Sequence, residues 1–339
     1  MSKNLLEIGK EMNLPDISQL DLRKNYGIFL KIGIVSETRG FFINRNNEAT
    51  EITSETFMNE ERLVVPASKW RGAERSYLLS ELRKIEGAIP EDYSRNMATR
   101  KALLQNPSSL IYGDSSTGSG SEAAGIASRV FYDWSYSFEP LPQISLRLLH
   151  NSLSEGGTIL QEEGGKVKSN ALYNIPYIKP GVKLIRYVSV ENCSIEMLAL
   201  ILMAISGTTR YGARTAILGD NMKNTVIAIG YSKRETPISS YSTVKKSWES
   251  GEYNPEESVL SEMKKSYGEN LLYGEELDCL MDLASKIRND KAELKGICTV
   301  LNAKMGKDWA EFWNEEGKDE KNIETCLIKF TSFREQPWP

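Results

Sequence analysis

Three cations stand at the start of a predicted helix. The segment 62–82, RLVVPASKWRGAERSYLLSEL, reads as a short apolar strand, a Pro-Ala-Ser break and then a helix. Lys69, Arg71 and Arg75 cluster in the first turns of this helix. A helix N-terminus already carries partial positive charge and normally attracts acidic side chains. Arg71 and Arg75 are also four residues apart, so they repel each other on one helix face.

Two interpretations account for this unfavourable placement. In the first, Ser68 caps the helix, and the N–H groups of the first turn bind a phosphate together with the surrounding cations. In the second, Glu74 compensates Arg71 at i+3, and the charges only support the helix. The residue types and their spacing are compatible with both.

A second candidate site is the segment GTTRYGAR at 207–214. Arg210 and Arg214 could form forked hydrogen bonds with phosphates, and Tyr211 could stack on a base. The glycines would allow the backbone to approach a ligand closely. The alternative is a helix end at Gly207 followed by a solvated turn. Lys223 lies just beyond, and the pattern matches neither GxGxxG nor a Walker loop.

A third candidate is the β-prone segment SRVFYDWSYSF at 128–138, which Arg129 opens. In a strand, alternate side chains share one face. The aromatic residues at positions 132, 134, 136 and 138 would therefore lie together. We expect this aromatic face to pack in the core.

The sequence offers little for covalent or metal chemistry. Its four cysteines, at 193, 279, 298 and 326, are at least 19 positions apart, which argues against zinc knuckles and CxxC pairs. The single histidine, His150, is not accompanied by a nucleophile motif. We therefore predict no bound metal and no cofactor.

The charge is distributed unevenly along the chain. The net charge is −4 overall, but residues 62–240 carry 21 Lys and Arg against 16 Asp and Glu, a net of +5. Residues 241–339 carry 14 against 20, a net of −6. A basic middle section can bind phosphates even in a nearly neutral protein. No apolar run reaches the roughly 18 residues that a membrane helix needs, so we expect a cytoplasmic protein without a membrane partner.

The elements that must position these residues follow a recognisable order. We expect strands within 26–45, 62–66, 128–138, 182–190 and 225–232, and helices at 71–86 and 194–206, the second capped by Ser194. Two β-like arms around Gly-rich bends at 143–180 predict a protruding hairpin. This order is close to the split βαβ plan, so we predict an α+β, ferredoxin-like or RRM-like core.

Several motifs resemble those of the RAMP superfamily of CRISPR RNA-binding proteins. The segment PASKWRGAERSYLL is similar to the Pro-x-Ser-Ser-Leu-Lys-Gly-x-x-Arg helix start of that family. LIYGD at 110–114 resembles its Leu-Phe-Gly segment, and SRVFYDWS resembles its Ser-Arg-Val-x-x-x-Asp strand. TTRYGAR stands where its late Gly-rich loop stands. The segments RGAERSYLL and RYGAR, together with the helical C-terminus, most resemble those of the backbone subunit of subtype I-D effector complexes.

This resemblance implies a non-catalytic role along a guide RNA. Copies of the chain would oligomerise on the crRNA and present it to target DNA or RNA, beside a large subunit and a 5′-end cap subunit. Residues 1–240 would form the palm, with a Gly/Ser-rich insertion at about 90–125 and a β-hairpin thumb at about 138–180. Residues 241–339 would form an acidic helical addition. The predicted RNA-binding residues are Arg39, Ser68, Lys69, Arg71, Arg75, Arg129, Arg210, Tyr211, Arg214 and Lys223.

The chain departs from the family pattern at two places. Residues 91–113 lack the cysteine cluster found in some I-D relatives, which again predicts no zinc. Related subunits of type III complexes cut target RNA with an Asp after the first strand, where this chain has SETRG. Metal-assisted cleavage needs a carboxylate near the phosphate. Glu37, and more weakly Asp114, are candidates for this alternative function, a metal-dependent endoribonuclease.

Overall fold

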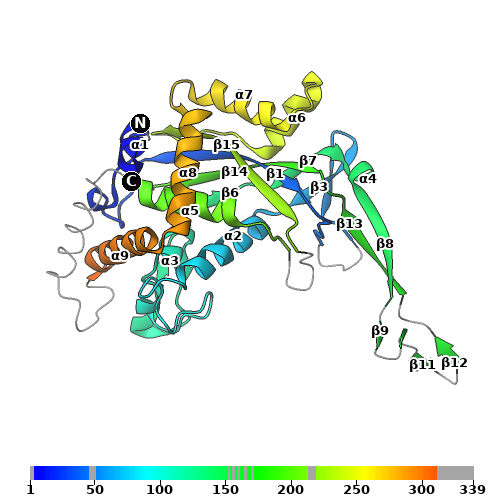
Figure 1. Cartoon of the computed structure of the whole chain (residues 1–339), viewed down its shortest axis with the longest axis horizontal. Coiled ribbons are helices and arrows are strands. Elements are labelled where there is room, and N and C mark those ends of the chain that lie inside the picture. The colour runs from blue at the N-terminus through cyan, green and yellow to red at the C-terminus, as the bar shows by residue number, and fades with distance from the viewer. Residues whose placement is uncertain are drawn as a thin grey trace.

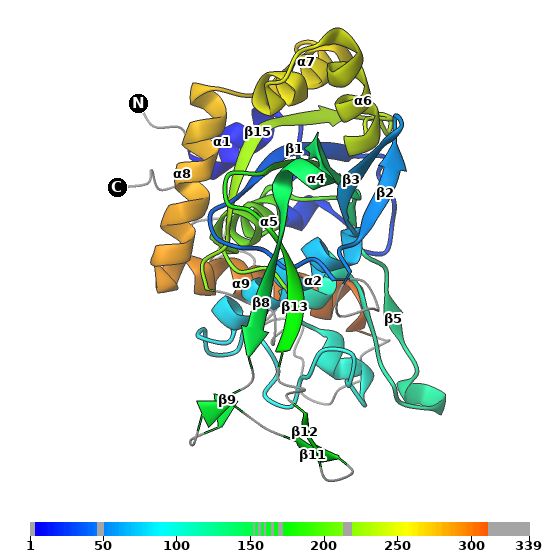
Figure 2. The ribbon, with the colours of Figure 1, turned by 90° about the vertical axis from the view of Figure 1, so that its right-hand side faces the viewer.

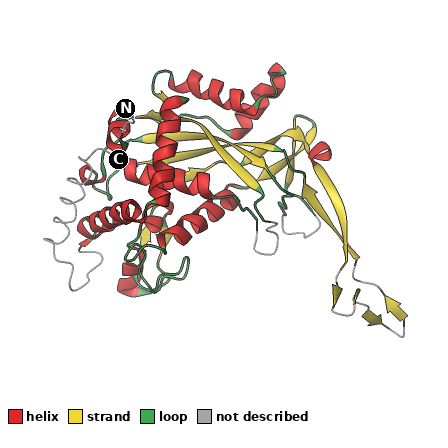
Figure 3. Ribbon diagram, viewed as in Figure 1, coloured by secondary structure: helices red, strands yellow, loops and turns green. Residues whose placement is uncertain are grey.

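The structure is a computed structural model of the chain, and it describes residues 4–45, 51–151, 153–154, 157–158, 161–163, 166–168, 172–212 and 219–310. A curved antiparallel sheet crosses the molecule, with helices on both of its faces (Figures 1 and 3). Two paired strands within the predicted hairpin, residues 145–151 and 172–178, project from one end of this body (Figures 1 and 2).

The sheet is built around the long strand β1 (Phe29–Thr38). β1 pairs antiparallel with β14 (Lys183–Glu191) on one side and with β15 (Met222–Ser232) on the other. The whole order is β16-β15-β1-β14-β7-β3-β2. The outer strands are β16 (Leu271–Leu272), β7 (Ser135–Pro140), β3 (Glu60–Val65) and β2 (Ser54–Phe57). Strand β6 (Val130–Tyr132) also pairs with β14. The predicted strands at 182–190 and 225–232 are thus confirmed.

Helices α2 (Ala67–Leu82) and α5 (Ile195–Gly207) cover one face of the sheet. Residues 195–205 of α5 are buried on all sides, as expected for a helix that is apolar around its whole circumference. Ser194 accepts a hydrogen bond from the Met197 amide at 3.4 Å, which confirms the predicted N-cap. Around this layer pack α1 (Leu5–Glu11), α8 (Glu275–Asn289) and α9 (Lys291–Asp308).

Helices α6 (Ser240–Ser250) and α7 (Pro255–Tyr267) cover the opposite face (Figure 1). Val259 of α7 lies so close to β1 that a Cβ on Gly33 would stand 2.6 Å from its Cγ1. The acidic C-terminal region therefore contributes to both faces of the sheet. Because α7 occupies the centre of this face, aromatic side chains there are not available as an open base-stacking platform.

The projecting hairpin consists of β8 (Ser145–Asn151) and β13 (Leu172–Ile178). Phe42, which follows β1, forms two backbone hydrogen bonds of 3.0 and 2.8 Å with Ile178 at the hairpin base. The ring of Phe41 contacts that of Tyr177 at 5.7 Å. The segment after β1 therefore joins the hairpin to the body.

Short elements complete the fold, and the long connection between α2 and β6 contains several of them. They are η1 (Ile17–Gln19), η2 (Lys101–Leu104), α3 (Pro107–Tyr112), β4 (Asp114–Ser115), η3 (Gly120–Glu122), β5 (Gly125–Ile126), α4 (Leu141–Ile144), β9 (Leu153–Ser154), β10 (Gly157–Thr158), β11 (Gln161–Glu163) and β12 (Lys166–Lys168). No helix in the described part of the chain is long and apolar enough to span a membrane.

Two local predictions are wrong. The predicted aromatic strand at 128–138 divides into β6 and β7, and Trp134 at the break is 47% exposed, whereas Ser135 and Ser137 are buried. The aromatic face therefore does not form as one core face, because the register against β14 shifts by one residue between β6 and β7 and the alternation of side chains is interrupted there. Ser68 is not the N-cap of α2: that position is Pro66, and Ser68 is an exposed residue within the first turn.

Candidate nucleic-acid interface

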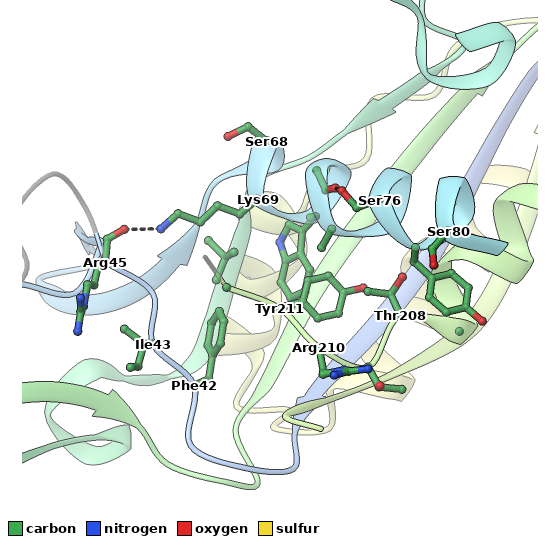
Figure 4. A pocket seen from close by; sticks show the side chains of 18 of the residues that line it. Phe42, Ile43, Arg45, Ser68, Lys69, Ser76, Ser80, Thr208, Arg210 and Tyr211 are labelled. Carbon is green, nitrogen blue, oxygen red and sulfur yellow. Dashed lines mark hydrogen bonds between the residues drawn. The ribbon is translucent and has the colours of Figure 1, made fainter. Parts of the chain in front are cut away.

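The first two candidate sites of the sequence meet at one cleft. The cleft has a volume of about 790 Å³ and lies between α2 and the segment that follows α5 (Figure 4). Its wall also includes part of the segment after β1, from Phe42 to Arg45. Four cations line it, and none of its described lining residues is acidic; the cations are Arg45, Lys69, Arg95 and Arg210.

Within the described part of the chain, no acidic side chain neutralises the charge of Lys69. Its ammonium donates hydrogen bonds to Asn44 Oδ1, at 2.6 Å, and to the carbonyl oxygen of Arg45 (Figure 4). Both acceptors are uncharged. Burial lowers the pKa of Lys69 because desolvation disfavours the charged form. An anion bound in the cleft would stabilise the charged form of Lys69 and so offset the effect of burial.

The other three cations reach the cleft from different segments. Arg210 is exposed and follows α5, and Arg45 is half-buried at the end of the segment after β1. Arg95 lies on the long connection after α2, where its guanidinium donates to the Gly72 carbonyl oxygen at 3.2 Å and to Ser76 Oγ at 3.0 Å. Arg45 and Arg95 could not be predicted from the sequence, because only the fold brings these distant positions to the cleft.

Gly207 is required by packing against a side chain. A Cβ placed on Gly207 would stand 2.3 Å from the Tyr77 ring of α2. We therefore expect Gly207→Ala to lower the free energy of unfolding by about 1–3 kcal/mol, since the ring or the helix must shift. Urea denaturation measures this change. Gly72→Ala is the control, because a Cβ there meets no atom within 4 Å; equal stability of the two variants would contradict the prediction.

Arg75 and Asp114 are partners in a buried ion pair, which corrects two predictions. Arg75 Nη2 lies 2.6 Å from Asp114 Oδ2, and the two side chains are only 5% and 2% exposed. Asp114 also accepts hydrogen bonds from the hydroxyls of Tyr93 and Ser109. In this arrangement Arg75 cannot reach a phosphate at the surface, and Asp114 is not open to a metal ion. Both residues brace α2 against the connection that follows it.

Arg71 and Arg129 also bind the protein's own backbone. Arg71 Nη2 donates to the carbonyl oxygen of Tyr112, and burial followed by repulsion from Arg75 lowers the pKa of Arg71. Arg129 is 9% exposed and donates to the carbonyl oxygens of Leu110 and Leu22, each at 2.8 Å. Arg129 therefore joins α3 to the N-terminal segment, away from any surface site.

Tyr211 lies in the core and is not a base-stacking residue in this structure. It is 2% exposed, and its ring packs edge-on against Trp70 at 4.8 Å. Its hydroxyl donates to Glu74 Oε1 at 2.8 Å and accepts from Asn224 Nδ2 at 2.8 Å. Burial and the Glu74 carboxylate raise the pKa of Tyr211 well above its ordinary value, so the hydroxyl keeps its proton.

Glu74 is the centre of a buried polar network that sequence reasoning missed. Its carboxylate lies 2.6 Å from Arg186 Nη2, and it also accepts from the Tyr132 hydroxyl at 2.5 Å. Glu74 thus pairs with a strand residue and does not compensate Arg71. Burial alone would lower the pKa of Arg186, but the attraction of Glu74 outweighs it and the pKa is raised. The only signal of this network in the sequence was Arg186, a charged residue inside the apolar stretch of β14.

The remaining predicted residues lie outside the cleft or outside the described part of the chain. Arg39 and Lys223 are exposed near one end of the sheet and are not lining residues. Ser68 lines the cleft as an exposed residue. Glu37, near the end of β1, faces Lys183 and Lys223 across the neighbouring strands. Arg214 lies among residues that the structure does not describe.

Metal-ligating side chains do not gather in the described part of the chain. Within it, no group of three or more His, Cys, Asp or Glu side chains is close enough to hold an ion. The cysteines at 193 and 298 are buried, and burial raises the pKa of the Cys298 thiol to about 12. These thiols therefore stay protonated and belong to the core.

The fold and the cleft define a mixed α+β protein with an antiparallel sheet and a cation-lined site between a helix and a glycine-containing segment. The chain belongs to the Csc2 CRISPR family, whose model matches residues 24–327. No curated protein matches the chain.

The chain is similar to several solved structures. The crystal structure of Thermofilum pendens Csc2 matches with a TM-score of 0.50 and 14% identity, over 93% of this chain and 99% of that chain. A chain of a CRISPR RNA-guided surveillance complex matches with a TM-score of 0.47 and 12% identity, over 77% and 98%. A chain of such a complex in a pre-nicking state gives 0.46 and 11%, over 78% and 100%.

Proposed function

We propose that this chain is a backbone subunit of a type I CRISPR surveillance complex and that its cleft binds the sugar–phosphate backbone of the guide RNA. The observation that carries the proposal is the group of four cations in a cleft whose described lining contains no acid. Phosphate oxygens are the natural ligands of such a group. Membership of the Csc2 family supports the assignment to a CRISPR complex.

The electrostatics of the cleft favour an anionic ligand such as RNA. Lys69 is half-buried and the two oxygens to which it donates are neutral, so its charge gains from an anion in the cleft. Arg210 is exposed, and within the described residues no hydrogen bond or ion pair engages it. Such contacts position a strand without reading its sequence, so base pairing by the guide would supply specificity.

The arrangement of elements supports the finer parts of the proposal. The order β15-β1-β14-β7, with α2 and α5 in the connections, is compatible with a ferredoxin-like palm over residues 1–240. The hairpin of β8 and β13 would be the thumb that closes over the guide. Copies of a cytoplasmic I-D subunit would repeat along the crRNA and leave bases free for target DNA, next to a large subunit and a cap subunit at the 5′ end.

The salt dependence of RNA binding tests this function. The purified full-length chain is titrated with a labelled single-stranded RNA of about 16 nucleotides, and anisotropy gives the affinity at several salt concentrations. If the four cations each contact one phosphate, the logarithm of the association constant should fall with a slope of about −2.8 against log salt. A peptide nucleic acid of the same sequence, which lacks phosphates, is the control. RNA binding that is absent at low salt, or equal for the two polymers, would contradict the proposal.

A further inference from the structure

Gly72 is a glycine that the fold itself does not require. It lies inside helix α2, where glycine is the poorest helix former after proline. A Cβ added to Gly72 would meet no atom within 4 Å. Gly207 contrasts with it, because the Tyr77 ring excludes a side chain there. Packing therefore explains why residue 207 is glycine. At position 72 glycine lowers the stability of the helix, and no packing contact within the protein requires it.

Gly72 is part of a row of small residues on the cleft wall. Ser68, Gly72, Ser76 and Ser80 are spaced four apart, so they share one face of α2. All four line the cleft, and Figure 4 shows the three serines along the helix. At 1.5 Å per residue the row is roughly 18 Å long. The row is a surface of small side chains, three of which carry hydroxyl groups.

Two donors in the same cleft lack acceptors. The indole N–H of Trp70, which is fully buried, has no hydrogen-bond partner among the described residues. The same holds for Nε of Arg45. Both residues line the cleft. Buried donors are normally paired, so these two N–H groups point to a ligand that is rich in acceptor oxygens.

We infer that the row Ser68, Gly72, Ser76 and Ser80 is the surface on which the sugar–phosphate backbone of a single strand lies in direct contact with α2, and that Gly72 is the point of closest approach. Without a Cβ, the strand comes nearer to the helix and to the Lys69 ammonium. Ser76 Oγ already donates to the Gly72 carbonyl oxygen and accepts from Arg95, so the hydroxyls of Ser68 and Ser80 are the ones that would face an RNA backbone, which carries both donors and acceptors. This inference rests on the proposed function and adds the contact mode.

Two of the cleft cations reach the row from different segments of the chain. Arg95 donates to the Gly72 carbonyl oxygen and to Ser76 Oγ, and so lies across the row. This contact does not itself need glycine, since no Arg95 atom lies within 4 Å of the added Cβ position. Arg210 reaches the cleft from the segment after α5. A strand along the row would meet cations from both segments.

Two substitutions separate folding from binding at Gly72. Gly72→Ala and Gly72→Leu are compared with Ala292→Leu, which adds bulk at an exposed position of α9 outside the cleft. Thermal unfolding and affinity for the labelled RNA of about 16 nucleotides are measured for each full-length variant. We expect the melting temperature of Gly72→Ala to equal or exceed that of the parent, because alanine is the better helix former.

The RNA affinities of the variants test the inference. Gly72→Leu should bind RNA roughly tenfold more weakly, as bulk forced into a close contact does, with a smaller loss for Gly72→Ala. Ala292→Leu should bind like the parent. Parental affinity in a folded Gly72→Leu protein would overturn the inference and leave the proposed function standing. If the parent chain fails to bind RNA, the proposed function falls and this inference falls with it. If Gly72→Leu does not fold, Gly72→Ala gives the answer.

Discussion

Glu74→Ala is expected to lower the free energy of unfolding by about 3–5 kcal/mol, the cost of breaking a buried ion pair by removing one partner. Glu74 and Arg186 are both completely buried, with 2.6 Å between Oε1 and Nη2. Without Glu74, Arg186 keeps hydrogen bonds to Ser36 and Asn224 but loses its counter-charge. Urea denaturation followed by circular dichroism measures the loss.

A control variant on the same helix shows whether the loss of stability is specific to the buried ion pair. Glu81 accepts from Lys84 at 2.7 Å in an ion pair whose lysine is 55% exposed. Glu81→Ala should therefore cost at most about 1 kcal/mol. Replacing both buried partners, as in Glu74→Leu with Arg186→Met, should cost less than Glu74→Ala alone, because no charge is then left unpaired. If Glu74→Ala and Glu81→Ala proved equally mild, the central role of the network would be wrong.

The second large effect is expected from reversing charge in the cleft. The double variant Arg45→Glu with Arg210→Glu should bind single-stranded RNA roughly 100-fold more weakly, since two phosphate contacts become repulsions. Its salt slope should become shallower by about 1.4, the loss of two phosphates on a single strand. Anisotropy titrations at several salt concentrations give both quantities.

A charge-matched variant controls for net charge. Lys245→Glu with Lys265→Glu makes the same change at exposed positions of α6 and α7, outside the cleft. This control should retain most of the affinity and the parental salt slope. The control should unfold within about 0.5 kcal/mol of the parent, as surface substitutions usually do. Circular dichroism shows whether the cleft variant, which changes the half-buried Arg45, is folded. Equal losses of affinity in the two variants would show that RNA is attracted by overall charge and does not occupy the cleft.

The predicted losses of stability and of RNA binding are linked, because the buried network also positions the cleft. Glu74 holds the Tyr211 hydroxyl, and Tyr211 is the neighbour of Arg210. The buried network therefore fixes the segment that carries one of the cleft cations. In the same way, Lys69 joins α2 to Asn44, and the backbone near Asn44 is bonded to the hairpin base through Phe42. The cleft is thus built where the core, the helix and the hairpin meet.

The sequence by itself determined the local elements and the general location of the site. Apolar periodicity and the Ser194 cap fixed α5, and β-prone runs fixed β14 and β15, because these signals depend on near neighbours. The motif on α2 and the segment after α5 were both identified, and they do line one cleft. The overall α+β class also followed from the order of elements.

Only the tertiary structure decided what each cation does. Lys69, Arg71 and Arg75 look alike in the sequence, yet Lys69 lines the cleft, Arg71 binds a carbonyl and Arg75 is buried against Asp114. Tyr211 was assigned to base stacking but fills the core, because Glu74 and Trp70 meet it there. Such outcomes depend on partners far away in the chain, and local spacing carries no information about them. The long-range packing that buries one charge and exposes its neighbour is what turns a basic motif into a site.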